Sequence, residues 1–230
     1  MIPRTLETEA MDTEEEARDY DAMDFADVNA LFCDDFLGFV GSLEGARVLD
    51  VGTGTARIPI VLAQRSPVAK VTAIDLAAHM LAVGRQNVLA AGLDARISLE
   101  LKDAKHAGWT DGSFDAVMSN SIVHHIPEPQ EALSEMARLT KTGGFLFVRD
   151  LCRPKSEDAI SSLIASYAGD PTKLDDEGKR RYPRQRDLFI ASLRAALTIE
   201  EIQTLAHSLG IPPARVSMSS DRHWTLAWRK

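Results

Sequence analysis

The sequence predicts an α/β protein with three layers, in which helices cover both faces of a mostly parallel sheet that an antiparallel hairpin completes. From position 47 onward, short runs rich in β-branched residues alternate with longer amphipathic stretches, as they do in consecutive βαβ units. Near the end of the chain, two apolar runs are separated only by Asp221, Arg222 and His223. This link suits a hairpin, because a crossover between parallel strands needs about a dozen residues or more.

Hydrophobic periodicity predicts the bounds of the individual strands and helices. Parallel strands are expected at 47–51, 70–75, 97–102, 114–120 and 144–149, with helices between them at about 56–65, 78–91 and 128–140. Further helices are expected at 8–40, 156–168, 184–196 and 198–209, and the two strands of the hairpin at 215–220 and 224–229.

The helical regions outside this alternation predict a lid. We expect residues 1–42 to form an N-terminal helical lid, and residues 43–230 to form the main domain with a helical insertion at about 155–197. Lids of this kind close over a bound substrate and exclude water from the reaction. Tyr20 and Met23 are candidates for contact with a ligand from the lid, and packing in the core explains them equally well.

Composition bounds the class of protein. The chain has 230 residues, of which 45% are hydrophobic and 26% charged, as expected for one globular domain with additions. No apolar run approaches the roughly 20 residues of a membrane span, and the N-terminus lacks the apolar segment of a signal peptide. The two cysteines, Cys33 and Cys152, do not have the spacing of a metal site. We therefore expect a cytoplasmic protein with no membrane span and no metal.

The net charge disfavours nucleic acid as a partner. The formal charge is −8, whereas proteins that bind a phosphate backbone usually present a basic surface. Residues 179–186 form one basic run, KRRYPRQR. It could be a solvated part of a helix, a source of arginines for an anionic small substrate, or a nucleic-acid contact. The overall charge makes the third interpretation the weakest, so a small-molecule substrate is expected.

A glycine-containing turn marks a candidate cofactor site. The segment VLDVGTGTA, residues 48–56, runs from the first expected strand through a turn to the start of the first helix of the alternation. Gly52 and Gly54 allow a sharp turn and a close approach of a ligand to the backbone, and Asp50 is placed to accept hydrogen bonds, including those of a ligand's ammonium group. A dinucleotide site would need a third glycine at position 57, which is Arg57. The pattern that fits is acid-x-Gly-x-Gly-x-small, with Ala56 as the small residue.

This segment resembles motif I of the class I, Rossmann-like S-adenosylmethionine-dependent methyltransferases, with Ala56 in place of the commoner third glycine. The resemblance implies S-adenosyl-L-methionine as cofactor and S-adenosyl-L-homocysteine as product. It also implies that Asp75 binds the ribose hydroxyls, that Asp103 lies beside the adenine amino group and that Asn120 lines the methionine arm. The complete set of expected cofactor contacts is Asp50, Gly52, Thr53, Gly54, Asp75, Leu76, Met80, Asp103, Ala104 and Asn120.

Candidate substrate or catalytic residues lie at the carboxyl ends of the later strands, where open α/β sheets bind ligands. They are His124, His125, Arg149, Arg222 and His223. A histidine is the natural general base for an acceptor that must lose a proton, and an arginine could hold an anionic group of the substrate. Structural roles remain open, since the histidines could cap a helix or pack on the cofactor, and the arginines could pair with nearby aspartates.

The resemblance is to the broad ubiquinone-methyltransferase-like group, which implies methyl transfer to an oxygen, nitrogen or carbon of a small molecule. Two alternatives remain open. The chain could bind the cofactor as a sensor without transferring its methyl group, or it could catalyse another reaction of the same cofactor. The sequence leaves the acceptor and the oligomeric state open, a homodimer included.

Overall fold

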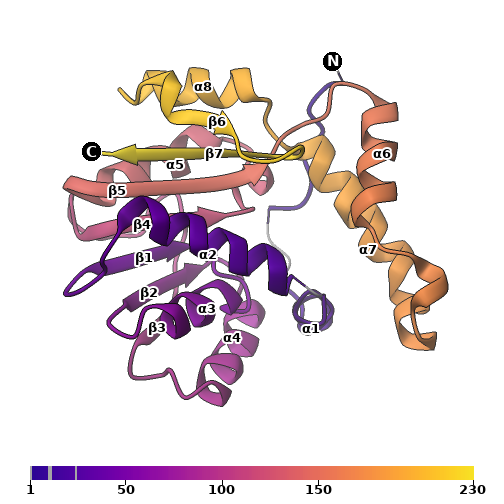
Figure 1. Ribbon diagram of the computed structural model, residues 1–230, viewed down its shortest axis with the longest axis horizontal. Helices are drawn as coiled ribbons and strands as arrows, with labels where there is room; N and C mark the ends of the chain where they lie inside the picture. Colours follow the sequence, from indigo (N-terminus) through magenta and orange to yellow (C-terminus); the bar gives the residue numbers. More distant parts are fainter. Residues whose placement is uncertain (1, 10–11, 24) are drawn as a thin grey trace.

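The computed structural model describes residues 2–9, 12–23 and 25–230 and shows the three predicted layers (Figure 1). Among these residues, seven strands form one sheet in the order β3-β2-β1-β4-β5-β7-β6. They are β1 (Arg47–Val51), β2 (Lys70–Asp75), β3 (Ile97–Leu101), β4 (Phe114–Asn120), β5 (Thr140–Leu151), β6 (Val216–Met218) and β7 (His223–Arg229). Strands β1 to β5 are parallel, whereas β7 is antiparallel to both β5 and β6. The predicted fold class is confirmed, including its terminal hairpin.

Helices bury an apolar cluster against each face of the sheet. Helices α2 (Ala26–Val40), α3 (Arg57–Arg65) and α4 (Ala78–Ala90) cover one face, and α5 (Pro129–Leu139) and α8 (Ile199–Ser208) cover the other. Strand β4 is almost continuously buried for this reason, as central parallel strands covered on both faces usually are. No helix in the described ranges is long and apolar enough to span a membrane.

The helix expected at 8–40 is two separate helices, α1 (Glu14–Asp21) and α2. Residues 10, 11 and 24 of that stretch lie outside the described residues. Helix α2 packs on the sheet, because Phe32 and Phe36 are fully buried and contact the ring of Phe147 edge-on. The later part of the expected lid is thus a layer of the main fold, and the domain boundary at 42 remains a prediction.

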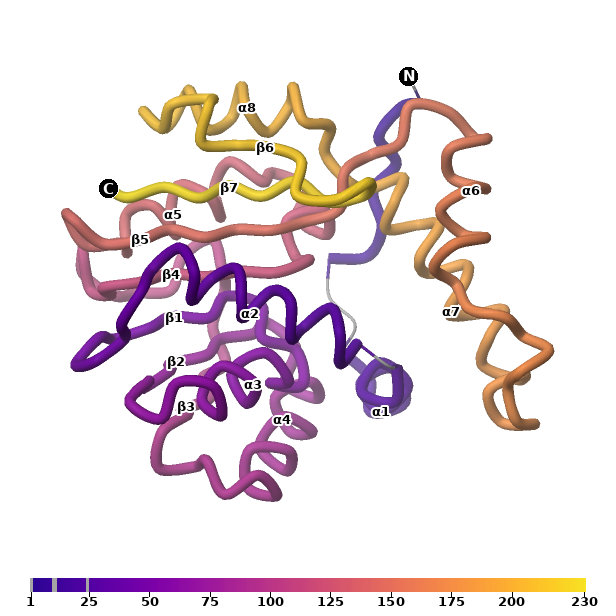
Figure 2. The backbone as a smooth tube through the Cα atoms, viewed as in Figure 1, coloured from indigo at the N-terminus to yellow at the C-terminus, as the bar shows by residue number. Residues whose placement is uncertain are grey.

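A second helical pair, α6 (Glu157–Tyr167) and α7 (Asp176–Ala195), lies beyond the carboxyl ends of the strands. Figure 2 shows the N-terminal segment passing between this pair and the sheet, where the Thr5 N–H donates to the Arg194 carbonyl at 3.1 Å. Helix α7 begins well before the expected start at 184, because the side chain of Asp175 caps its first turn. The helix continues through Pro183, which removes one backbone donor without ending it.

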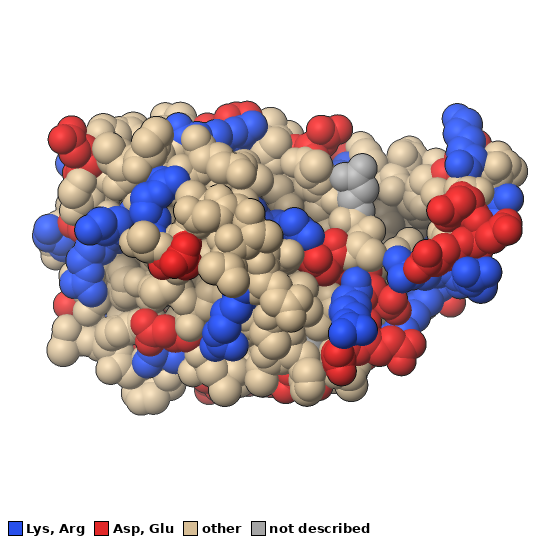
Figure 3. Space-filling view, turned by 90° about the horizontal axis from the view of Figure 1, so that it is seen from below, with Lys and Arg blue, Asp and Glu red and all other residues tan. Residues whose placement is uncertain are grey.

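The basic run 179–186 lies within α7 and faces the acidic helix α1. Arg184 Nη1 lies 3.0 Å from a carboxylate oxygen of Asp19, and Arg181 Nε lies 3.6 Å from the other oxygen of Asp19. Figure 3 shows acidic and basic side chains mixed over this end of the molecule. The run is therefore partly neutralised within the chain, which weakens its interpretation as a nucleic-acid contact.

Candidate active site

The turn after β1 has a backbone that glycine alone accepts easily. Gly52 has φ 75°, and its N–H and that of Thr53 both donate to the Ile74 carbonyl at 2.9 Å. A Cβ atom at position 52 would lie 2.2 Å from Cγ2 of Ile122, the residue two positions after β4. Gly54, with φ 55°, is covered by the ring of Tyr20. The turn is thus held between β2, the segment after β4 and helix α1.

We expect Gly52→Ala to lower stability and cofactor affinity together. The left-handed conformation costs about 1–2 kcal/mol for a residue with a Cβ, and the overlap with Ile122 adds about 1–3 kcal/mol. Gly210→Ala is the matched control, because Gly210, which follows the end of α8, has nearly the same φ of 76° and a Cβ atom added there would meet no other atom within 4 Å. Chemical denaturation of both variants checks this. Equal losses of unfolding free energy would contradict the steric part of the argument.

Asp75, at the end of β2, connects this turn to helix α4. Its carboxylate accepts hydrogen bonds from the Gly54 N–H at 2.7 Å and the Ala77 N–H at 2.9 Å. Burial raises the pKa of Asp75, and the backbone donors partly oppose that shift. Each carboxylate oxygen can accept a second hydrogen bond, so the residue can hold the turn and still receive donors from a ligand.

Four further expected contacts lie near Asp75 at the edge of the sheet. Met80 is buried against α1, whereas Leu76 is exposed and free to contact a ligand. Asp103 accepts a hydrogen bond from the Lys105 N–H at 2.8 Å and remains part-exposed, and Ala104 packs against the neighbouring core.

Two polar atoms at the ends of β1 and β4 are buried without a partner. Oδ2 of Asp50 and Oδ1 of Asn120 have no hydrogen-bond partner among the residues that the structure describes. Burial, with a further contribution from the charge of Asp75, raises the pKa of Asp50 to about 7. A hydrogen bond with Thr53 only partly opposes this shift. Burial of a carboxylate that lacks a cationic partner is unfavourable, so a cationic group of a ligand beside Asp50 would lower that energetic cost.

Helix α1 covers this turn, because the ring of Tyr20 lies over Gly54. Asp21 accepts hydrogen bonds from Arg57 at 2.7 and 2.9 Å and from Nδ2 of Asn87 at 2.9 Å, which fastens α1 to α3 and α4. Burial and the charges of Asp75 and Asp50 raise the pKa of Tyr20 to about 12, so its phenol stays a neutral donor. Met23 lines a small hollow beside Tyr20. Contact of Tyr20 and Met23 with a ligand remains a prediction, and sequence reasoning missed that Asp21 joins α1 to α3 and α4.

His124 lies in a 3₁₀ turn, Val123–His125, that follows β4. Its Nδ1 lies 2.5 Å from Oδ1 of Asp150, near the end of β5. The other oxygen of Asp150 accepts the backbone N–H of Val123 at 2.6 Å and that of His124 at 3.2 Å. Both His124 and Asp150 are buried. Asp150 therefore fixes the turn and the orientation of the imidazole, a role that sequence reasoning did not assign to it.

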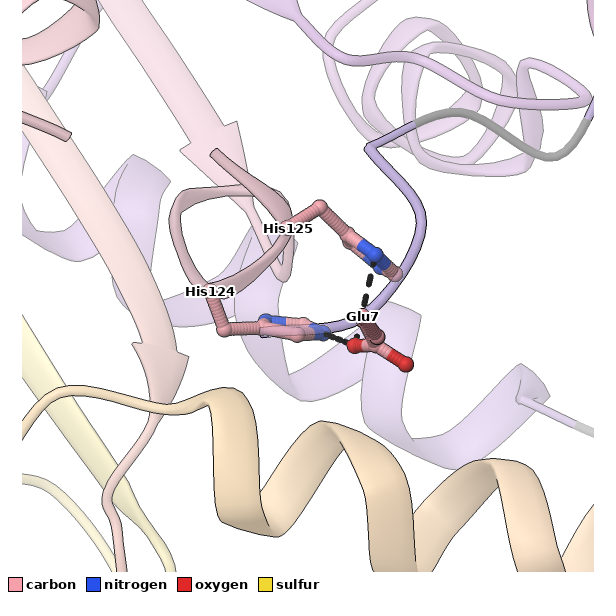
Figure 4. A group of neighbouring side chains, drawn as sticks. All are labelled: Glu7, His124 and His125. Atoms are coloured by element: carbon pink, nitrogen blue, oxygen red, sulfur yellow. Dashed lines mark ion pairs between the residues drawn. The ribbon is translucent and has the colours of Figure 1, made fainter. Parts of the chain in front are cut away.

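Glu7 of the N-terminal segment faces both histidines (Figure 4). Its Oε1 lies 3.5 Å from Nε2 of His124 and 3.3 Å from Nδ1 of His125. Arg4 holds the segment in place by donating to the carbonyls of His124 at 3.2 Å and Ala195 at 2.7 Å. Sequence reasoning missed Glu7, because no local pattern links it to the segment after β4.

The charges of this group differ from residue to residue. Burial opposes the charged form of His124, but the charge and hydrogen bond of Asp150, helped by Glu7, raise its pKa overall. Burial and the charge of His124 lower the pKa of His125 to about 3, so that imidazole is neutral. Burial raises the pKa of Glu7, whereas His124 lowers the pKa of Asp150 against the effect of burial.

The remaining candidates contact other parts of the chain. Arg149 precedes Asp150 on β5 and points to the opposite face, where its guanidinium donates to Asp35 at 2.7 Å and to Thr225 Oγ1 at 2.9 Å. This pairing, with the burial of Arg149, gives no support to the expected substrate contact.

The hairpin turn lies at the expected edge of the sheet, since Cys152 N–H donates to the Arg222 carbonyl at 2.7 Å. The Arg222 side chain covers the ring of Tyr167 on α6. His223 Nδ1 lies 2.9 Å from Ser220 Oγ, and burial lowers the pKa of His223 to about 4. The side chains of Arg222 and His223 thus stabilise the turn and its contact with α6.

Comparison with known proteins identifies the class. The family model of the methyltransferase domain matches residues 49–148. A ubiquinone biosynthesis O-methyltransferase of Xanthomonas oryzae pv. oryzae is 31% identical over 182 residues, which cover 78% of this chain and 74% of that protein. Methyltransferase GfsG of Streptomyces halstedii is 31% identical over 140 residues, covering 60% of this chain and 50% of GfsG. A SAM-dependent methyltransferase structure from Aquifex aeolicus has a TM-score of 0.66 at 18% identity and covers 94% of this chain and 98% of that one.

The chain therefore belongs to the class I, Rossmann-like methyltransferases. It is an S-adenosylmethionine-dependent methyltransferase, as its glycine turn indicated, and S-adenosylmethionine is its cofactor. The residues present fit that molecule, because Asp50 offers an unpartnered buried oxygen to a cationic amino group and Asn120 offers another acceptor close to it along the sheet edge.

Proposed function

We propose that this methyltransferase transfers the methyl group to an oxygen atom of a small molecule, and that His124 activates that oxygen. The buried Asp150–His124 pair, 2.5 Å apart beside the cofactor turn, is the observation that carries the proposal. The ubiquinone biosynthesis O-methyltransferase relative supports an oxygen acceptor. Residue 122, between Asn120 and His124, packs on Gly52, so the histidine turn adjoins the turn that would bind the cofactor.

The expected cofactor contacts fit one path along the edge of the sheet. Asp50 would bind the amino group, Asn120 the methionine arm, Asp75 the ribose hydroxyls and Asp103 the adenine. Gly52, Thr53 and Gly54 would present backbone and hydroxyl groups to the same molecule, with Leu76, Met80 and Ala104 around the adenosine. When bound, the cofactor would supply the methyl group of its sulfonium. The rest of the cofactor is the leaving group and becomes a neutral thioether.

The residues of the chain align the acceptor and remove its proton. Alignment alone supplies a large part of the rate in such displacements. The acceptor hydroxyl would donate to Nε2 of His124, which takes its proton as the new carbon–oxygen bond forms. The carboxylate of Asp150 on Nδ1 stabilises the resulting imidazolium. In the structure, the Glu7 carboxylate faces Nε2 of His124. The acceptor would therefore take the place of this carboxylate beside Nε2.

Product analysis tests the proposal against its alternatives. The purified protein would be incubated with S-adenosylmethionine and paired acceptors that differ only in hydroxyl or amine, such as phenols and the matching anilines. We expect S-adenosylhomocysteine and a methyl ether in equal amounts. Cofactor binding with no homocysteine product from any acceptor would favour a sensor, and methylated amines alone would overturn the oxygen assignment.

A further inference from the structure

Three ligand-type atoms from distant parts of the chain converge beside the cofactor turn. They are Oε1 of Glu7, Nε2 of His124 and Nδ1 of His125, and all lie within 4.8 Å of one another (Figure 4). Two of them, Glu7 Oε1 and His125 Nδ1, are buried and have no hydrogen-bond partner among the described residues. Native proteins rarely leave buried polar atoms unpaired, so this group invites a ligand that all three atoms can bind.

The contacts inside the group leave its polar atoms incompletely paired. A proton on Nε2 of His124 can face Glu7, but at 3.5 Å the contact is long. Nδ1 of His125 has no hydrogen-bond partner among the described residues, so this ring nitrogen can offer a lone pair to a ligand. The two rings lie 4.1 Å apart, so a cation placed between their nitrogens and Glu7 would contact all three.

Asp150 prepares His124 for this role. A metal-bound histidine usually donates its other ring N–H to a carboxylate, which fixes the tautomer and the orientation of the ring. His124 has this arrangement, with Nδ1 at 2.5 Å from Asp150 and Nε2 directed toward Glu7. The same carboxylate binds the backbone of the histidine turn, so the ring cannot easily turn away.

We propose that Glu7, His124 and His125 bind one divalent transition-metal ion. Metal–ligand bonds of about 2.0–2.2 Å in a tetrahedral site place neighbouring ligand atoms about 3.3–3.5 Å apart. The two distances from Glu7 Oε1, 3.5 and 3.3 Å, already have this length. Two imidazoles and one carboxylate favour zinc and its neighbours in the first transition row over magnesium or calcium, which prefer oxygen ligands.

Such a site would leave a coordination position open for the acceptor. Three protein ligands with one free position are typical of catalytic zinc sites, where the ion lowers the pKa of a bound hydroxyl or water. The acceptor oxygen could bind there and release its proton to solvent, and Nε2 of His124 would then serve as a ligand instead of a base. The inference rests on the cluster alone and does not require that methyl transfer to oxygen be correct.

Zinc binding to the full chain tests the site directly. Untagged protein is treated with chelator and dialysed, and zinc uptake is followed by calorimetry and by metal analysis. We expect about one zinc per chain. Glu7→Gln and His125→Gln should each weaken binding at least about tenfold, and Asp150→Asn, which acts through His124, about 10–100-fold. Thermal unfolding of each variant shows that it is folded.

Glu9→Gln is the matched control, because Glu9 lies on the same segment and pairs with Lys105 outside the cluster. It should bind zinc as the wild type does. No zinc uptake by the wild type, or equal uptake by the wild type and Glu7→Gln, would overturn the metal site. If the wild type takes up no zinc but still transfers methyl groups, the metal site is wrong and the proposed function stands without it. Zinc uptake lost in Glu7→Gln and His125→Gln would support the site even if no acceptor were methylated.

Discussion

Replacing both His124 and His125 by alanine is expected to lower kcat at least about a hundredfold, the range measured for loss of a general acid or base. The variant removes the group that activates the acceptor, whether that group acts as a base or holds a cation. Affinity for S-adenosylmethionine should change little, because the expected cofactor contacts at Asp50, Asp75 and Asn120 are untouched. Steady-state kinetics and calorimetry on the same preparation measure both quantities.

His207→Ala is a suitable control, since His207 is exposed on the last turn of α8, away from the sheet edge. It should keep the kcat of the wild type. The single variants His124→Gln and His125→Gln then divide the effect between the two rings, and the larger loss is expected for His124, the ring that Asp150 orients. A double variant with unchanged turnover would remove the histidines from the reaction.

Local periodicity was sufficient to predict the ends of three strands and the residues that they carry. The expected bounds of β1, β2 and β4 coincide with the observed ones, so Asp50, Asp75 and Asn120 lie where the pattern predicts. β5 runs two residues past its expected end at 149, to Leu151. Side chains alternate along a strand, and this places Asp150 on the histidine side and Arg149 against α2, a distinction that the expected bounds did not reveal.

The contacts that sequence reasoning missed join segments far apart in the chain. Glu7 reaches the histidines because Arg4 binds carbonyls of the turn after β4 and of the end of α7. Neither residue carries a periodic signal, since the segment 2–9 is neither helix nor strand. The start of α7 also differs from the expected one. A proline usually interrupts a helix, and the helix was expected to begin at 184, directly after Pro183, whereas α7 includes Pro183.

Asp50→Asn is expected to weaken S-adenosylmethionine binding strongly while making the free protein more stable. Burial raises the pKa of Asp50 from 3.8 to about 7, so folding favours its protonated form. The free protein therefore loses stability as the pH rises from the unfolded pKa through about 7, and the penalty persists above it. Asparagine keeps the shape without the charge and removes that penalty. It also removes the partner of the cofactor's amino group, so the gain in melting temperature at about pH 8 should accompany lost affinity.

The same carboxylate makes cofactor affinity depend on pH in a defined direction. Only ionised Asp50 attracts a cationic amino group, so binding should weaken about tenfold for each pH unit below about 7, once protonation dominates the free protein. Calorimetry between about pH 5.5 and pH 7.5 should show a loss of roughly 25-fold in the wild type and a nearly flat profile in Asp50→Asn. Wild-type affinity that is independent of pH across this range would mean that Asp50 does not bind the amino group, and the carboxylate would then need another partner.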